Sequence, residues 1–293
     1  GLTDYVGAVT DGTYGAVGLD FKSPHTGLAA KKVWFFFDKT YVCLGTDISS
    51  RMKNQVLTTV NQCLLNGQVT VSDADGIHPQ ERGSRMKKGV RWVVHDRVGY
   101  YFLNKENVIL SNQRTEGSWK IANRQTTTPT DIIQQDVFTL SVDHGSYPNN
   151  EGYAYMVVPS ADPLSIEKQV EEEGVVVLAN CPDVQAVRHD GLNMAYAVFY
   201  KGGTLRIHDK IVVEMDAPGM LMVKYNDAGE ILTLGVSDPT RFMKKLHLSV
   251  NQRIVGTAQE NIQTEWDGKQ ALTRISVDLP QNEYAGKSVI YNK

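Results

Sequence analysis

The densest set of side chains able to do chemistry is a basic run bounded by Gly83 and Gly89, in a chain whose formal net charge is only −3. Arginine presents paired N–H groups to a carboxylate or sulfate, and lysine presents a point charge. Such a run suits a polyanionic ligand, although most charge runs are only solvated loops. We predict ligand contact for five residues of this run: Arg82, Arg85, Lys87, Lys88 and Arg91.

Two other polar groups attract attention for their residue types. His144, Tyr147 and Asn149 resemble a proton-transfer and carboxylate-neutralising set, but they crowd one loop. Asp73 and Asp75, followed by glycine, begin like a calcium loop but lack its distant bidentate glutamate, so we attribute the pattern to chance.

The elements that would position these residues are strands. Two apolar segments, 33–37 and 41–44, surround Asp38-Lys39 and predict a β-hairpin. Continuous runs rich in β-branched and aromatic residues suit strands covered on both faces, as in a stack of sheets. Turn dipeptides that favour positive φ angles separate the apolar runs and begin at Asp11, Asn66, Asp75, Asp190, Gly202 and Asp267. The predicted class is all-β.

One segment, 163–173, is predicted to be helical. Asp162 serves as its cap, Pro163 as its first residue and Gly174 as its end. Its expected apolar face consists of Leu164, Ile166 and Val170.

Near the end of the chain, the segment LTRISVDL indicates a sheet with one face in water. Its apolar side is predicted to hold Leu272, Ile275, Val277 and Leu279, and its polar side Arg274, Ser276 and Asp278. The change from doubly covered to half-covered strands places a domain boundary near Leu205. We therefore expect domains at 1–205 and 206–293.

Composition bounds the function. A length of 293 residues is enough for two β domains. The near-neutral charge indicates no nucleic-acid partner, and no apolar run approaches the roughly 18 residues of a membrane helix, so no membrane partner is expected. Cys43, Cys63 and Cys181 lack metal-ligand spacing and are interpreted as core thiols.

Four segments together resemble one family. They are the apolar hairpin that starts at Lys31, TTVNQCLL (58–65), DHGSYPNNEGYAYMVVP (143–159) and CPDVQAVRHDGL (181–192). In this order they are similar to family 8 polysaccharide lyases, which cleave hyaluronan, chondroitin and xanthan. The resemblance implies a large antiparallel β super-sandwich of the galactose mutarotase type, followed by a smaller C-terminal β-sandwich. It covers most of the chain.

The resemblance also implies what the chain lacks. Family members carry an N-terminal α/α toroid that supplies most catalytic groups for β-elimination, and no such helical array is visible in this sequence. We therefore predict a scaffold and cleft wall that is inactive alone, assign no catalytic residue, and interpret the DHG segment at 143–145 as a structural corner. The implied partners are an acidic polysaccharide and the missing toroid. The implied location is secreted or periplasmic, where a disulfide between Cys43 and Cys63 stays open.

Four further residues gain roles from the resemblance. Trp34 stands where relatives carry an aromatic that faces the cleft, and an indole stacks well on a pyranose, although a core tryptophan is the alternative. His25, in the preceding loop, would line the same rim. Asp11 and Asp20 match calcium ligands of some relatives, but another ligand position holds Val9, so calcium is optional and no cofactor is required.

Two other functions stay open. The chain is alternatively a free-standing carbohydrate-binding or structural β module that never had a toroid. An epimerase-like enzyme is a third possibility, because the large sandwich resembles that of the mutarotases, but no His–Glu pairing in the sequence recommends it.

Overall fold

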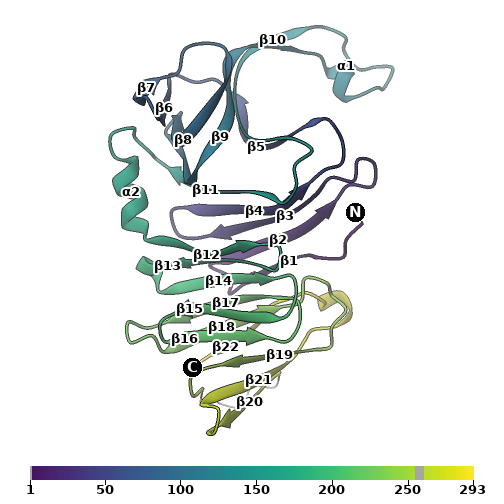
Figure 1. Cartoon of the computed structure of the whole chain (residues 1–293). Coiled ribbons are helices and arrows are strands. Elements are labelled where there is room, and N and C mark those ends of the chain that lie inside the picture. Colours follow the sequence, from purple (N-terminus) through teal and green to yellow (C-terminus); the bar gives the residue numbers. More distant parts are fainter. Residues whose placement is uncertain (1, 255–260) are drawn as a thin grey trace. The chain divides into compact units, whose positions relative to one another are not determined.

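The protein consists almost wholly of antiparallel strands in a computed structural model that describes residues 2–254 and 261–293 (Figure 1). The all-β prediction is confirmed. The chain divides into two compact units. Unit 1 comprises, within the described residues, Gly1–Met52, Pro148–Ala154 and Glu167–Lys293, and unit 2 comprises Lys53–Tyr147 and Tyr155–Ile166.

The first layer of unit 1 contains the predicted hairpin. Its strands are β1 (Val6–Thr10), β2 (Gly15–Lys22), β3 (Ala29–Phe36) and β4 (Tyr41–Ser49). Strands β3 and β4 pair with Phe36 opposite Tyr41, as expected for a turn at Asp38-Lys39. Residues 42–46 of β4 are all buried, whereas β3 alternates between buried and partly exposed positions.

A six-stranded sheet forms the middle layer of unit 1. Its strands are β12 (Val175–Cys181), β13 (Val184–His189), β14 (Met194–Phe199), β17 (Gly219–Tyr225), β18 (Ile231–Ser237) and β22 (Val289–Asn292). This sheet packs against β1–β4, where the ring centroids of Tyr196 and Phe35 are 5.9 Å apart. The Phe199 carbonyl accepts a hydrogen bond from the Tyr5 hydroxyl at 2.9 Å. All six residues of β14 are buried, because both faces of the strand are covered.

A five-stranded sheet forms the third layer of unit 1. Its strands are β15 (Gly203–His208), β16 (Ile211–Met215), β19 (Lys245–Val250), β20 (Ile262–Asp267) and β21 (Leu272–Asp278). Its inner face shares one apolar core with the six-stranded sheet, to which Ile275 and Val277 contribute. Leu272 was predicted inward but alternates onto the outer face with Arg274, while Thr273 is buried. The boundary expected near Leu205 falls within β15 and stays a prediction.

Unit 2 contains long, bent strands. They are β5 (Gln55–Leu64), β6 (Val69–Asp73), β7 (Gly76–Pro79), β8 (Ser84–His95), β9 (Val98–Gly117), β10 (Ile133–Ser146) and the second half of β11 (Glu151–Pro159). Strand β9 pairs with β8, β10 and β11, and β10 also pairs with β5. Fully buried Trp92, Phe102 and Phe138 anchor the unit. One turn of helix, α1 (Trp119–Ala122), lies between β9 and β10.

The predicted turns have mixed outcomes. The dipeptides at Asp11, Asp75 and Asp267 close hairpins between paired strands. The dipeptides at Asn66 and Gly202 connect strands that do not pair with each other. The dipeptide at Asp190 lies in a short 3-10 turn, 190–192, and a second such turn is at Asn282–Tyr284.

The predicted helix exists but is shorter than expected. Helix α2 (Ile166–Glu173) begins three residues late because the Asp162 carboxylate accepts the Leu164 N–H at 2.9 Å and holds a turn first. Leu164 is consequently exposed rather than on the apolar face, whereas Ile166 is buried. Gly174 follows the last helical residue with φ +61°, as a helix-ending glycine should.

The three cysteines are free thiols. Cys43 is buried, as predicted, but Cys181 is exposed, so its assignment to the core was wrong. Cys43 and Cys63 do not lie on neighbouring strands, since among the described strands β5 pairs with β10 alone.

Candidate functional site

The basic run of β8 is largely neutralised by neighbouring carboxylates. Arg82 lies 2.8 Å from Asp136, and Arg85 lies 2.7 Å from Glu81. The hydrogen bond from Arg82 is the main reason why the pKa of Asp136 lies below its usual value. Both arginines are therefore already paired with a carboxylate at the protein surface.

Lys87 is held in the same way. Its ammonium lies 3.0 Å from Asp73, which also accepts a hydrogen bond from His78 at 3.0 Å. Burial would raise the pKa of Asp73, but the bonds from Lys87 and His78 outweigh it and lower that pKa. The side chain of Asp73 is only 7% exposed, so the carboxylate stabilises unit 2 and is not available to a calcium ion.

The side chains of the run have different surroundings. Arg85 and Lys87 stand opposite the buried residues Leu110 and Val108 of β9, whereas Met86 between them points to the other face. Lys88 is exposed and has no ion-pair partner among the described residues. Arg91 donates to the Tyr101 hydroxyl at 3.3 Å and has a further partner. Ligand contact by the run stays a prediction.

Trp34 is half-buried on β3 between Val17 of β2 and Cys43 of β4. The ammonium of Lys32 lies 5.5 Å from its ring centroid, and burial lowers the pKa of that lysine. On the same face, Phe36 is 42% exposed. The ring therefore lies at the boundary between the packed sheet and an open apolar face of unit 1.

His25 does not join Trp34. It is exposed in the turn between β2 and β3, where its N–H bonds to the Ser23 hydroxyl at 3.3 Å. The strand from Ala29 to Trp34 puts about 17 Å between that turn and the indole. The two side chains are therefore not in contact with each other, and the prediction that both line one rim and contact sugar stays a prediction.

Asp11 and Asp20 lie at opposite ends of β2. Asp11 accepts the N–H groups of Thr13 and Tyr14 at 3.0 and 2.9 Å and pairs with Lys224 at 2.5 Å. Burial opposes a lower pKa for Asp11, but the bond from Lys224 prevails and lowers it. Burial raises the pKa of Asp20, and about 17 Å of strand separates it from Gly15.

The two carboxylates therefore do not fit one shared calcium ion. Asp11 is already neutralised by Lys224, and Asp20 alone offers few of the six to eight oxygens that calcium takes. Across residues 2–254 and 261–293, no group of three or more His, Cys, Asp or Glu side chains is arranged to hold a metal ion. Calcium binding by this chain stays a prediction.

The DHG segment is used for structure. His144 is buried and shares a 2.9 Å hydrogen bond with the Thr58 hydroxyl, while Gly145 adopts φ +70°. The Asp143 carboxylate accepts the Gly145 N–H at 2.9 Å and the Gln55 amide at 3.0 Å. These bonds make a corner at the end of β10, and the exposed Tyr147 that follows also has positive φ.

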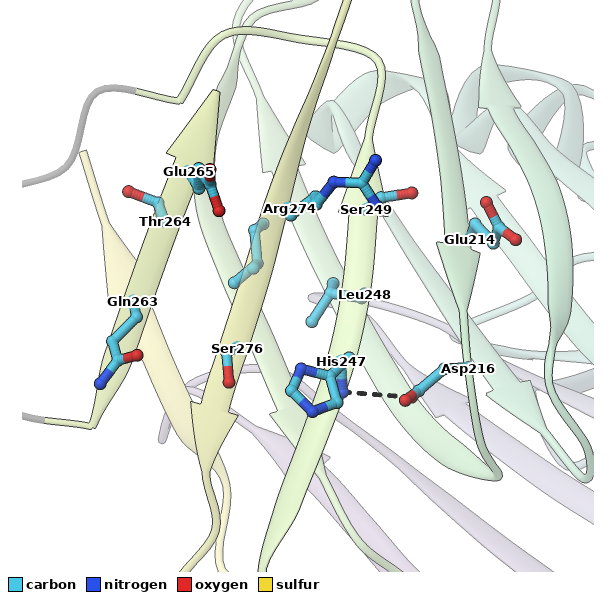
Figure 2. A pocket seen from close by; sticks show the side chains of 11 residues that line it. Glu214, Asp216, His247, Leu248, Ser249, Gln263, Thr264, Glu265, Arg274 and Ser276 are labelled. Carbon is cyan, nitrogen blue, oxygen red and sulfur yellow. Dashed lines mark hydrogen bonds between the residues drawn. The ribbon is translucent and has the colours of Figure 1, made fainter. Parts of the chain in front are cut away.

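Sequence reasoning missed a groove on the outer face of the five-stranded sheet (Figure 2). Its volume is about 600 Å³. Because side chains opposite each other on antiparallel strands share a face, pairing arranges its polar side chains in two rows across β16, β19, β21 and β20. One row is Glu214, Ser249, Arg274 and Glu265, and the other is Asp216, His247, Ser276 and Gln263.

The groove carries excess negative charge. Arg274 is held by Asp267 at 3.1 Å and by the Gln270 carbonyl oxygen of its side chain at 2.7 Å. Glu214 and Glu265 have no cationic partner among the described residues. The groove can hydrogen-bond hydroxyl groups, but its charge opposes a polyanion. The alternation in LTRISVDL predicted a solvent-exposed face here. The sequence did not show which strands pair with this one to complete the groove.

The structure also bears on membranes. Among the described residues, neither helix has the length and apolar character needed to cross a bilayer.

Comparison with known proteins gives consistent results for both parts of the chain. The model of the polysaccharide lyase family 8 super-sandwich domain matches residues 1–170, and that of the family's C-terminal beta-sandwich domain matches residues 176–247. Chondroitinase-AC of Pedobacter heparinus is 36% identical over 291 residues, 99% of this chain and 38% of the relative. A hyaluronate lyase of Thermasporomyces composti is 29% identical over 96% of this chain and 36% of its own length.

Solved structures agree. A chondroitinase AC lyase studied as enzyme–oligosaccharide complexes superposes with a TM-score of 0.84 at 35% identity, covering 99% of this chain and 40% of the other. A Paenibacillus xanthan lyase gives a TM-score of 0.86 at 23% identity, with 99% and 28% covered, and shows the fold alone. The predicted super-sandwich and C-terminal β-sandwich are confirmed. The chain spans about two fifths or less of the length of these proteins.

Proposed function

Because the chain belongs to polysaccharide lyase family 8, we propose that it is the C-terminal β portion of a lyase that cleaves uronic-acid-containing polysaccharides, of the chondroitin or hyaluronan type, by β-elimination. One observation carries the proposal: the match to chondroitinase-AC covers 99% of this chain but 38% of the relative. More than half of the relative lies beyond the match, which leaves room for the helical toroid that the resemblance implies. The proposed partners are that toroid and an acidic polysaccharide.

The proposed segment has no turnover of its own. In β-elimination, a base removes the C5 proton of the uronate while the C4 glycosidic oxygen departs, and charge develops on a carboxylate that the enzyme must neutralise. Burial raises the pKa of Tyr153, Tyr196 and Tyr200 above its ordinary value, so these hydroxyls stay protonated near neutral pH and offer no phenolate to accept the proton. The Tyr200 hydroxyl donates instead to Gln185 at 2.8 Å, within the layers of unit 1.

The proposed contribution of the segment is a wall of the cleft. The half-exposed ring of Trp34, with Lys32 beside it, offers an indole face for a pyranose and a cation for its carboxylate. Val17 and Phe36 extend the same face and are 36% and 42% exposed. Apolar exposure of this kind marks an interaction surface. Export from the cell is part of the proposal.

The test compares this chain with the complete protein encoded by its gene. Both are incubated with chondroitin sulfate, hyaluronan and xanthan, and the ultraviolet absorbance of unsaturated uronate products is followed. We expect product from the complete protein and none from the 293-residue chain. Trp34→Ala in the complete protein is expected to raise KM more than it lowers kcat, because Trp34 holds sugar and moves no proton.

Two outcomes would overturn the proposal. Product formation by the 293-residue chain alone would show a self-contained active site. A gene whose upstream reading frame encodes no helical domain would favour a free-standing carbohydrate-binding module, and export is checked by fractionating cells that express the complete gene.

A further inference from the structure

The hairpin formed by β9 and β10 extends beyond every strand that flanks it. Strands β9 and β10 pair from Val108 opposite Val142 to Gly117 opposite Ile133. Strand β8 accompanies β9 only as far as Ser111, and β5 accompanies β10 only from Val137. Residues 113–136 therefore form a two-stranded arm, whose tip is residues 118–132 (Figure 1).

The arm has no core of its own. None of the residues 113–135 is buried. An isolated two-stranded hairpin is marginally stable in water, so a projecting arm is a costly feature for a fold to keep. A role in binding accounts for its presence.

Apolar side chains gather at the tip. Trp119 is 61% exposed and Ile121 is 80% exposed, and Ile132 and Ile133 on the returning strand are also exposed. Several exposed apolar side chains on one short segment are typical of an interaction site. An indole in such a group supplies a flat face to a ligand and an N–H donor at its edge.

The tip also holds cations whose charge is not neutralised. The Lys120 ammonium donates to the Gln125 backbone carbonyl at 2.7 Å and, among the described residues, has no carboxylate partner. Arg124 is exposed and forms no hydrogen bond or ion pair within the described part of the chain. One acid, Asp131, lies in the tip, so its formal charge is positive. Arg114, nearer the base, is by contrast paired with an aspartate.

Local bonds give the tip a defined shape. The Ser118 hydroxyl accepts the Lys120 N–H at 3.3 Å and caps α1. The Asn123 N–H bonds to the Trp119 carbonyl at 2.8 Å, and the Asn123 side chain accepts the Gln125 N–H at 3.1 Å. The indole and the cations therefore belong to one hydrogen-bonded turn. Thr126 and Thr127 are exposed and Thr128 is partly exposed, which adds hydroxyl groups to the tip.

We propose that the tip of this arm is a binding element for acidic polysaccharide, in which Trp119 stacks on the apolar face of a pyranose while Lys120 and Arg124 pair with carboxylate or sulfate groups. The inference rests on the proposed function and names residues that the sequence did not single out. An indole beside two cations and several hydroxyls fits a sugar polyanion, which offers apolar ring faces, hydroxyls and anionic groups at a regular repeat. The acidic groove of the C-terminal sandwich does not fit such a ligand.

The experiment measures binding of the 293-residue chain to size-defined chondroitin sulfate and hyaluronan oligosaccharides by calorimetry, with neutral dextran as the control sugar. Trp119→Ala and the double variant Lys120→Ala/Arg124→Ala are each expected to weaken binding about tenfold, which is about 1.4 kcal/mol. The salt dependence of affinity should also be shallower for the double variant, because fewer counterions are released from the polyanion.

Matched controls lie in the C-terminal sandwich. Phe242→Ala removes an aromatic that is 75% exposed, and Arg253→Ala/Lys269→Ala removes two exposed cations that form no ion pair among the described residues. These variants should bind like the original chain. All tip positions are on the surface, so each variant should keep its melting temperature and circular dichroism.

Equal affinity of tip and control variants would overturn the inference. So would binding to vesicles of phosphatidylcholine and phosphatidylglycerol that is lost in the tip variants while the oligosaccharides show no binding, since the tip would then contact membrane. The proposed function fails separately. If the complete protein shows no lyase activity while the tip still binds oligosaccharide, the lyase assignment is wrong and the binding element stands.

Discussion

Gly45 in the middle of β4 is the position where an added methyl group is expected to do most harm per atom. A Cβ built on Gly45 would lie 2.5 Å from Cζ and 2.6 Å from Cδ1 of the Tyr153 ring. Tyr153 is 3% exposed, so its ring has no open space into which to move. The strand is covered on both faces at this point, and Gly45 permits the ring to lie directly on the backbone.

Two effects of Gly45→Ala oppose each other. Alanine reduces the entropy of the unfolded chain, which stabilises the fold by about 0.4–1 kcal/mol where the native conformation is compatible. Overpacking a well-filled core costs about 1–3 kcal/mol. Since the contacts to Tyr153 are well below van der Waals distance, the second effect should win, and Gly45→Ala should lower the melting temperature by about 1–4 °C in a chain of this size.

Differential scanning calorimetry on the 293-residue chain measures the change, and Gly203→Ala is the matched control because a Cβ there meets nothing within 4 Å. A double-mutant cycle with Tyr153→Ala isolates the clash: once the ring is removed, Gly45→Ala should cost about 0.5 kcal/mol or less. If Gly45→Ala is as stable as Gly203→Ala, or if its cost persists without the ring, the close approach of Tyr153 to Gly45 is wrong.

Three further predictions concern ionisable groups. Asp73 has a lowered pKa in the folded protein, so the stability that it contributes is complete above its unfolded pKa of about 3.9 and is lost as the pH falls further. Asp73→Asn should cost about 1–3 kcal/mol at pH 7. In this variant the free energy of unfolding, measured with urea, should depend less on pH in the acid range. Tyr196 has a raised pKa, so its contribution is complete below about pH 10 and disappears above it; ultraviolet titration should show that it ionises only with unfolding, and Tyr196→Phe should shift that step. The His189 side chain, 5% exposed, shares a 2.9 Å hydrogen bond with Glu173, so Glu173→Ala should cost about 1–3 kcal/mol in urea titrations, whereas Glu173→Gln, which keeps a hydrogen-bonding group, should cost less.

Much of the fold could be predicted from apolar patterning. The uninterrupted run of β4 indicated double coverage, and the layers of unit 1 supply it, whereas the run in β3 was expected to be covered on both faces but leaves Trp34 partly exposed and Phe36 exposed. The alternating pattern predicted the outer sheet but placed Leu272 on the wrong face. The residue type alone does not show whether a single leucine lies on the solvent-exposed face or on the buried face of a strand. Leu164 was wrongly placed on the apolar face of the helix because Asp162 holds a turn before the helix begins. The sequence pattern of a cap does not tell whether the helix starts at once or after such a turn.

The candidate site could be predicted much less well, because function here depends on which charges meet. Three cations that lie close together in sequence, Arg82, Arg85 and Lys87, suggested a ligand patch. Their carboxylate partners come from other strands or from the preceding loop. His25 and Trp34 are near in sequence, yet a strand running away from the turn separates them. The spacing of residues in the sequence predicts neither which charges pair nor in which direction a strand runs.

A nearly neutral chain can still bind a polyanion if its positive charges are left unpaired in one place. The chain has 30 basic and 33 acidic residues, and some of its cations, such as Arg82 and Lys87, lie within ion-pair distance of a carboxylate; the exposed pairs among them contribute little to stability. At the tip of the arm, Lys120 and Arg124 lie beyond the last flanking strand, have no carboxylate partner among the described residues and are close in the chain to the exposed Trp119. Because the arm projects beyond its flanking strands, it has no core, and Lys120 and Arg124 are available to a ligand. Replacing both cations should therefore weaken oligosaccharide binding and leave the stability of the fold unchanged.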